Sequence, residues 1–125
     1  KVEDHRRKLL VLLSSLIGRG YRLAGVSAPA KGMTLLNYCG IGTAYLDFIT
    51  EKSGLKIGTH TPGGHIPIVS DDDLLSKDID YALVLAWNFK EEIMNNLVEF
   101  QRRGGRFIVP IPEPHVVEGL SNEKN

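Results

Sequence analysis

The sequence has little cysteine, no long hydrophobic run and no excess of charge of either sign. Cys39 is its one cysteine, so the chain alone can form neither an internal disulfide nor a thiolate metal cluster, and we expect a reducing, cytoplasmic compartment. The longest apolar runs, Leu9 to Leu13 and Ala82 to Trp87, fall far short of the roughly 20 residues that cross a bilayer. Disulfide scaffolds and membrane-spanning proteins are therefore excluded.

Charge and length limit the kinds of protein that this chain can be. Fifteen Lys and Arg balance fifteen Asp and Glu, without the basic excess that nucleic-acid binding requires. The start, Lys1 to His5, has two acids but neither Met nor the apolar core of a signal peptide, so we expect the chain to be part of a longer protein. With 125 residues, 42% of them hydrophobic, it is long enough for one compact domain with a core.

Apolar periodicity alternates between two kinds of segment. Helices are predicted over residues 3–18, 31–40, 71–77 and 88–103. Strands are predicted over residues 22–27, 45–50, 65–69, 80–86 and 106–111, with a glycine-bearing loop over 51–64. Because nearly continuous apolar strands bury both faces, the fold class is α/β: a small Rossmann-like, three-layer domain with a mostly parallel sheet.

In such sheets ligands bind at the carboxyl ends of the strands, so the segment from Gly25 to Gly32 is the first candidate site. It reads as strand, tight turn and helix start, where free backbone N–H groups favour a phosphate or pyrophosphate. The segment matches neither Gly-x-Gly-x-x-Gly nor the Walker pattern, and no acid follows it at the right place. An ordinary turn of small residues explains the segment equally well.

Two further places carry candidate side chains. Trp87 and Asn88 end the most apolar strand: either they border a ligand, or Trp87 is core and Asn88 caps the next helix. His60 and His65 lie in the glycine-bearing loop, either as proton-transfer or ligand-orienting groups or as surface and loop-anchoring residues.

Nothing in the sequence supports a catalytic residue or a metal site in this chain. It contains no nucleophile elbow, no His-Glu-x-x-His and no Cys-x-x-Cys. The acids Asp71 to Asp73 are interpreted as a helix cap rather than a cation site, and Cys39 as buried packing. Arg102, Arg103 and Arg106 are expected on a solvated face.

Several separated motifs, in order between Arg22 and Pro112, carry a resemblance to a known family. They are Ala28-Pro29-Ala30-Lys31-Gly32, Thr34-Leu35-Leu36-Asn37-Tyr38, Gly40-Ile41-Gly42, Pro62-Gly63, His65-Ile66-Pro67-Ile68, Leu85-Ala86-Trp87-Asn88, Glu91-Glu92-Ile93, Gly104-Gly105-Arg106-Phe107 and Pro110-Ile111-Pro112. Together they resemble the C-terminal domain of the sugar C-methyltransferases, S-adenosylmethionine-dependent enzymes that methylate a carbon of nucleotide-linked deoxysugars.

The resemblance implies a domain that works with others. A zinc-binding N-terminal domain and a central methyltransferase domain precede it in that family, and neither is part of this chain. The S-adenosylmethionine and the acid/base residues are expected in the central domain, where a base removes a proton beside a ketone and the resulting enolate attacks the sulfonium methyl. This chain is expected to be inactive alone and to close the sugar-nucleotide side of the active site.

The family resemblance and the phosphate site predicted from the helix start point to the same residues. Backbone N–H groups near Ala30 to Gly32 would hold the pyrophosphate of a dTDP-sugar, with Lys31 adding charge. The full set of expected substrate-binding residues is Ala28, Pro29, Ala30, Lys31, Gly32, His65, Trp87 and Asn88.

The sequence departs from the family pattern at two positions beside this site. Ser27 and Met33 stand where the family usually has Gly and often has Asn. Two other functions fit the same residues: a stand-alone nucleotide- or CoA-binding module, and a docking domain that only holds subunits together.

Overall fold

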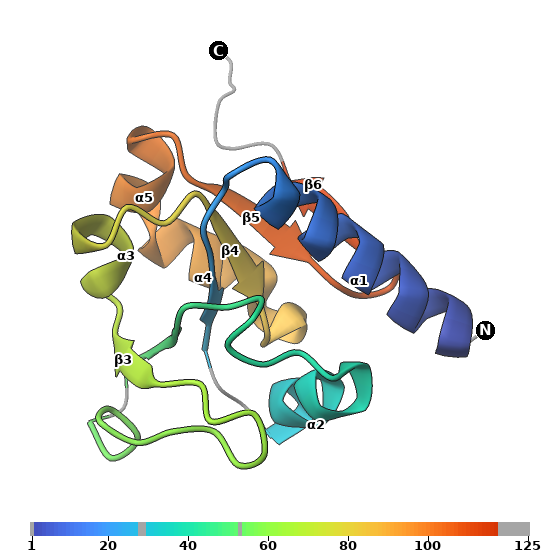
Figure 1. Cartoon of the computed structure of the whole chain (residues 1–125). Helices are drawn as coiled ribbons and strands as arrows, with labels where there is room; N and C mark the ends of the chain where they lie inside the picture. The colour runs from blue at the N-terminus through green and yellow to red at the C-terminus, as the bar shows by residue number, and fades with distance from the viewer. Residues whose placement is uncertain (1, 28–29, 53, 118–125) are drawn as a thin grey trace.

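The computed structural model describes residues 2–27, 30–52 and 54–117 (Figure 1). Its helices are α1 (Val2–Gly18), α2 (Ala30–Cys39), α3 (Asp73–Ser76), the 3-10 turn η1 (Trp87–Phe89), α4 (Lys90–Asn96) and α5 (Val98–Arg102). Its strands are β1 (Leu23–Val26), β2 (Ile49–Glu51), β3 (Ile68–Ser70), β4 (Tyr81–Val84), β5 (Arg106–Val109) and β6 (His115–Val117). No described helix has the length and apolarity to cross a membrane.

The six strands form a single sheet in the order β3-β2-β1-β4-β5-β6. Neighbours from β3 to β5 pair in parallel, and β6 runs antiparallel to β5. The chain builds outward from β1 to β3, then returns to lay β4 on the other side of β1. The order therefore reverses between β1 and β4, which is the switch point of a doubly wound fold. The expected Rossmann-like α/β class is confirmed.

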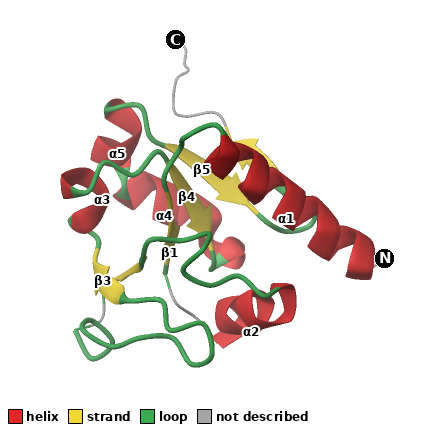
Figure 2. Ribbon diagram, viewed as in Figure 1, coloured by secondary structure: helices red, strands yellow, loops and turns green. Residues whose placement is uncertain are grey.

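Helices cover both faces of the sheet, as Figure 2 shows. Side chains alternate between the two faces along each strand: in β1, Leu23 joins one core cluster, and Ala24 and Val26 join the other. The first cluster packs the sheet against α1 and α2, and the second packs it against α3, α4 and α5. A Cβ built on Gly25 would lie 3.0 Å from Leu85 Cδ1 and 3.1 Å from Ile49 Cγ1, so neighbouring side chains pack closely against this glycine.

The segment around β2 and β3 differs from the prediction. The strand predicted over residues 45–50 begins only at Ile49, because the N–H groups of Tyr45 and Leu46 both donate to the carbonyl of Gly42 and form a turn. The strand predicted over 65–69 is displaced to Ile68–Ser70. His65 has a φ of 56° and donates its N–H to Thr61, which closes a turn rather than starting a strand.

The helix predicted over residues 88–103 is three shorter pieces. Leu97 leaves the helical region with φ −116° and ψ 41°, which separates α4 from α5. The Met94 carbonyl at this break accepts from the Leu97 N–H and from Gln101 Nε2 at 2.9 Å, so the interruption leaves it satisfied. Apolar periodicity continues across the break, which explains why the sequence indicated one helix.

The chain turns back after β5 and adds a strand that the sequence did not indicate. The strand predicted over 106–111 ends at Val109, Ile111-Pro112 is a cis peptide, and β6 then pairs antiparallel with β5, placing His115 opposite Val109. Residues 112–115, which follow β5, therefore form a reversal at the side of the sheet.

Candidate functional site

The switch point brings two of the predicted segments to one edge of the sheet. Val26 and Val84 are paired at the ends of β1 and β4, and the N–H of Leu85 donates to the Val26 carbonyl at 3.1 Å. The chain leaves β1 toward α2 and leaves β4 toward η1. The start of α2 and the residues of η1 therefore both belong to the carboxyl edge of the sheet, as the sequence predicted.

Ser27, the residue that leaves β1, has a left-handed backbone. Its φ is 66°, and its N–H donates to the Thr50 carbonyl at 2.9 Å. A residue with a Cβ is disfavoured there by about 1–2 kcal/mol, whereas glycine adopts this region freely. This conformation explains why the family resemblance has glycine at the position of Ser27.

The first turn of α2 is where the sequence predicts phosphate binding. Ala30 to Gly32 form this turn, while Ala28 and Pro29 lie outside the described residues. α2 has ten residues and no acid in its first turn, so no carboxylate of its own opposes an anion at the positive end of the helix dipole. Phosphate binding here remains a prediction.

Trp87 and Asn88 lie in η1, immediately after β4. Trp87 is half-buried and Asn88 is exposed, and neither belongs to the two core clusters. Asn88 lies inside the 3-10 turn and makes no capping hydrogen bond, so its interpretation as a helix cap is wrong. A surface depression of about 400 Å³ is lined by residues 87–92. Both side chains are thus available at the carboxyl edge.

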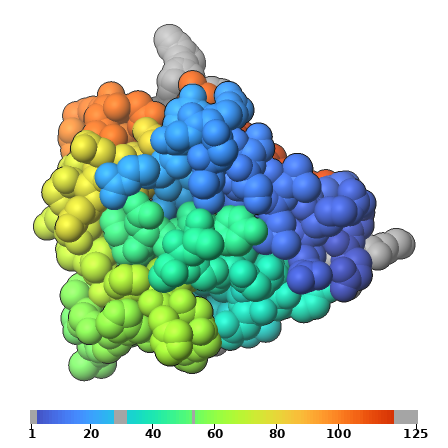
Figure 3. All heavy atoms as spheres, in the orientation of Figure 1, coloured from blue at the N-terminus to red at the C-terminus, as the bar shows by residue number. Residues whose placement is uncertain are grey.

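His65 lies near the opposite edge of the sheet. It is two residues before Pro67, whose carbonyl accepts from the N–H of Ile49, the first residue of β2. The neighbouring Gly64 lies against Gly42, in the turn that leads from α2 back to β2. His60 forms an isolated bridge with Pro67, and both histidines are exposed. The structure therefore separates the histidines from Trp87 and Asn88. Figure 3 shows the loop that carries them at one corner of the molecule.

Glu51 is not among the binding residues that the sequence predicts. It is the last residue of β2, next to β1 at the carboxyl edge. It lines a cavity of about 100 Å³ together with Ser27, Asp71 and Asn96. The predicted strand ended at Thr50, which assigned Glu51 to a loop. Its place in the topology, about 20 residues after the turn that follows β1, is the signal that could have identified it.

The acids from Asp71 to Asp73 act neither as a side-chain cap nor as a metal centre. Asp72 occupies the N-cap position of α3 without a side-chain cap bond, and its N–H donates to Ser70 Oγ at 3.3 Å. Within residues 2–27, 30–52 and 54–117, no three His, Cys, Asp or Glu side chains are placed to share a metal ion.

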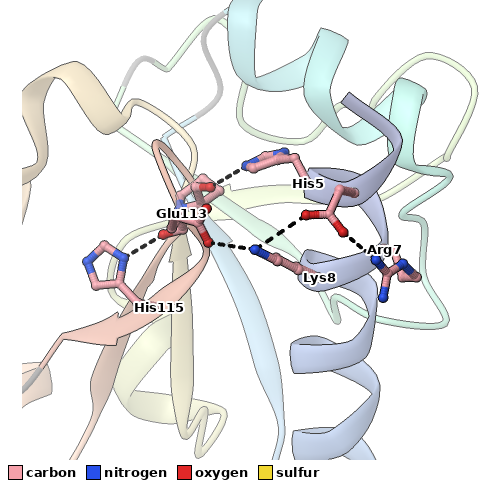
Figure 4. Close-up of polar contacts among 7 residues, drawn as sticks. His5, Arg7, Lys8, Glu113 and His115 are labelled. Carbon is pink, nitrogen blue, oxygen red and sulfur yellow. Dashed lines mark hydrogen bonds and ion pairs between the residues drawn. The ribbon is translucent and has the colours of Figure 1, made fainter. Parts of the chain in front are cut away.

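The carboxyl end of β5 is covered by α1, as the close-up in Figure 4 shows. His5 Nε2 lies 2.6 Å from the Pro110 carbonyl, and Lys8 Nζ lies 3.2 Å from Glu113 and 3.4 Å from Asp4. Hydrogen bonds to Glu113 and Asp4 raise the pKa of Lys8, and the bond to Lys8 lowers the pKa of Asp4. These contacts hold the chain reversal against α1, which leaves the ends of β1, β2 and β4 as the open part of the edge.

Cys39 is a structural residue. Its side chain is 2% exposed in the cluster between the sheet and the α1–α2 layer, which confirms its interpretation as buried packing. Burial raises the pKa of its thiol, so the reactive thiolate is disfavoured.

Comparison with known proteins extends these observations. Residues 1–112 match the sequence model of a family described as the C-methyltransferase C-terminal domain. The chain is also 42% identical over 119 residues to the C-methyltransferase NovU of Streptomyces niveus. The match covers 95% of this chain but 28% of NovU, so the chain spans little more than a quarter of that relative's length.

Proposed function

Because the chain belongs to the family of C-methyltransferase C-terminal domains, we propose that it binds the sugar nucleotide in an S-adenosylmethionine-dependent C-methyltransferase. The proposed substrate is a dTDP-linked keto-deoxysugar, and the proposed compartment is the cytoplasm. The observation that carries the proposal is the switch point, where the start of α2 and the Trp87-Asn88 pair share one open edge.

Each part of this edge suits one part of a sugar nucleotide. The backbone N–H groups at the start of α2 favour the pyrophosphate, to which Lys31 would add charge. The indole of Trp87 offers a flat apolar face, and the amide of Asn88 can both donate and accept hydrogen bonds. His65, which lies near the other edge, enters the site only if another part of the substrate or another domain reaches it.

The site is open and needs a second wall. The cavity beside Glu51 measures about 100 Å³, and the depression of about 400 Å³ beside Trp87 is lined by a single segment. Ligand pockets bury most of the ligand's surface between several elements. This edge alone does not enclose a ligand, so we propose that a preceding methyltransferase domain closes over it and binds S-adenosylmethionine.

The chemical contribution of this chain is positioning. By holding the pyrophosphate and the sugar, it would present the substrate carbon to groups on the preceding domain, and fixing that geometry lowers the barrier without supplying an acid or a base. The chain alone is expected to bind substrate and to transfer no methyl group.

A titration of the 125-residue chain tests this proposal. Trp87 is the only tryptophan in the sequence, so its fluorescence reports on the carboxyl edge directly. We expect dTDP to change this fluorescence and to raise the melting temperature, because a ligand that binds only the native state stabilises it. S-adenosylmethionine and CoA should do neither.

Two lysine variants locate the binding. Lys31→Ala should weaken dTDP binding, whereas Lys77→Ala, which removes an exposed lysine after α3, should leave it unchanged. Stabilisation by CoA in place of dTDP would instead support a CoA-binding module. Equal effects of the two variants would contradict the phosphate site at the start of α2.

A further inference from the structure

We propose that the cavity at the carboxyl ends of β1 and β2 is a subsite for the 3′ hydroxyl of the nucleotide's pentose, with Glu51 as the acceptor. The inference deepens the proposed function, on which it rests in one respect: it takes the nucleotide phosphate to lie at the start of α2. It adds a binding residue and fixes the direction in which the nucleotide lies across the sheet.

The strand order places Glu51 beside the phosphate site. Thr50 pairs with Val26, so β2 ends directly next to the strand that leads into α2. Neighbouring strands are about 4.8 Å apart, and one such step separates the 5′ phosphate of a nucleotide from its pentose. In doubly wound folds that bind NAD, an acid about 20 residues after the phosphate turn accepts a hydrogen bond from the ribose 2′ hydroxyl. In the deoxyribose of dTDP the neighbouring 3′ hydroxyl is the one available to such an acid. Glu51 occupies that topological position.

The cavity has the size for hydroxyl groups. Its volume of about 100 Å³ lies between the ends of β1 and β2, Asp71 and the break between α4 and α5 at Asn96 and Leu97. A water molecule occupies about 30 Å³ in the liquid, so this volume corresponds to about three waters. It can receive the hydroxyl side of a pentose, whereas the base must lie outside it.

The charges of the lining set the orientation. Glu51 and Asp71 contribute carboxylates, and Lys52 contributes one cation. Carboxylates accept hydrogen bonds from hydroxyls and repel phosphate oxygens, whereas the first turn of α2 contains no acid. The phosphate is therefore favoured at α2 and the pentose at Glu51. The reverse direction would bring phosphate oxygens against two carboxylates.

A buried hydroxyl lies on the same side of the sheet. The side chain of Thr50 is fully buried, and its Oγ1 has no hydrogen-bond partner among the residues that the structure describes. Ile49 contacts the Gly25 position on the first face, so Thr50 lies on the opposite face, as does Val26, which lines the cavity. A polar group without a partner among the described residues thus lies on the same face of the sheet as Val26, which lines the cavity.

Calorimetric titration of the chain with dTDP and with 3′-deoxy-dTDP tests the subsite. The two nucleotides differ by the hydroxyl assigned to Glu51. For the parent chain we expect about tenfold weaker binding of the 3′-deoxy compound, the size of one hydrogen bond to a charged group. Because this comparison uses the parent chain, it does not depend on the folding of any variant.

Glu51→Ala should bind dTDP about tenfold more weakly than the parent chain does. Its affinity for 3′-deoxy-dTDP should equal that of the parent chain, because this compound lacks the hydroxyl that Glu51 would bind. Glu99→Ala, which removes an exposed carboxylate from α5, is the matched control and should bind both nucleotides as the parent does.

The outcomes separate the two proposals. If dTDP binds, responds to Lys31→Ala and is insensitive both to Glu51→Ala and to the 3′ hydroxyl, the phosphate site stands and the pentose subsite is wrong. If dTDP does not bind the parent chain at all, the pentose subsite and the phosphate site are both overturned. The positioning role would then be decided by the methyltransferase assay of the full-length protein.

Discussion

The two edges of the sheet use their polar groups in opposite ways. At the amino edge they bind one another: the N–H of Arg22 donates to Asp80 at 2.8 Å, and its guanidinium pairs with Asp47 at 2.9 Å. Arg103 donates to the carbonyls of Leu74 and Ile79 at 2.5 and 2.6 Å. These contacts tie together the starts of β1 and β4 and the ends of α3 and α5.

The carboxyl edge leaves comparable groups available. No side chain caps α3, η1 or α4, Ser27 holds a left-handed backbone, and the Thr50 hydroxyl lacks a partner among the described residues. The contrast teaches that one edge maintains the fold, and it supports the proposal that the other edge binds a ligand. Substitutions should therefore reduce stability at the amino edge and affect ligand binding at the carboxyl edge.

The largest expected effect is at the amino edge, at Gly105. A Cβ on this residue would lie 2.4–2.6 Å from ring atoms of Phe100, which is fully buried and packs edge-to-face on Phe107. Gly105→Ala should lower the free energy of unfolding by about 3 kcal/mol, since the ring cannot move without displacing the core. Urea denaturation measures this change. A loss below about 0.5 kcal/mol, the range of ordinary surface substitutions, would show that this corner repacks freely.

A smaller effect should distinguish two adjacent arginines. Arg103 bonds two backbone carbonyls and lies 5.2 Å over the Phe100 ring, whereas Arg102 pairs with exposed Glu99. Arg103→Ala should cost about 1–2 kcal/mol of stability, because it leaves two carbonyls without their donor. Arg102→Ala should cost less than about 0.5 kcal/mol. Equal losses of stability in the two variants would show that the contacts of Arg103 do not stabilise the amino edge.

The smallest effect has the opposite sign and lies at the carboxyl edge. Ser27→Gly should stabilise the chain by about 0.5 kcal/mol, because relief of the left-handed strain exceeds the entropy that glycine loses on folding. Ser14→Gly, at an exposed position within α1, should instead destabilise it by about 0.5 kcal/mol. Thermal unfolding of both variants gives the signs, and destabilisation by Ser27→Gly would refute the strain at the switch point.

Most helices and strands that depend on local sequence patterns were predicted from the sequence. Leucine spacing identified α1, the segment after Lys31 identified α2, and continuous apolarity identified β4. These segments placed the switch point correctly. Arg102, Arg103 and Arg106 are exposed, which confirms the expected solvated face, but the bonds of Arg103 to backbone carbonyls in distant segments were not predicted.

The remaining differences come from contacts that no local pattern contains. The break at Leu97 is accompanied by a bond from Gln101 to Met94, and β6 forms where the chain reverses after Pro112 and pairs with β5. Glu51 joined the candidate site only when the strand order placed β2 beside β1. The site is thus predictable where it follows a strand directly and not where it depends on strand order.

Mapping of backbone amide chemical shifts during titration with dTDP tests the difference between the two edges most directly. The account predicts shifts that saturate together at Ser27, Gly32, Glu51 and Asn88, all on the carboxyl edge. The amides of Arg22, Asp80 and Gly105 on the amino edge should not move. Saturable shifts centred on the amino edge, or on His65, would contradict the central claim that the switch point binds the nucleotide.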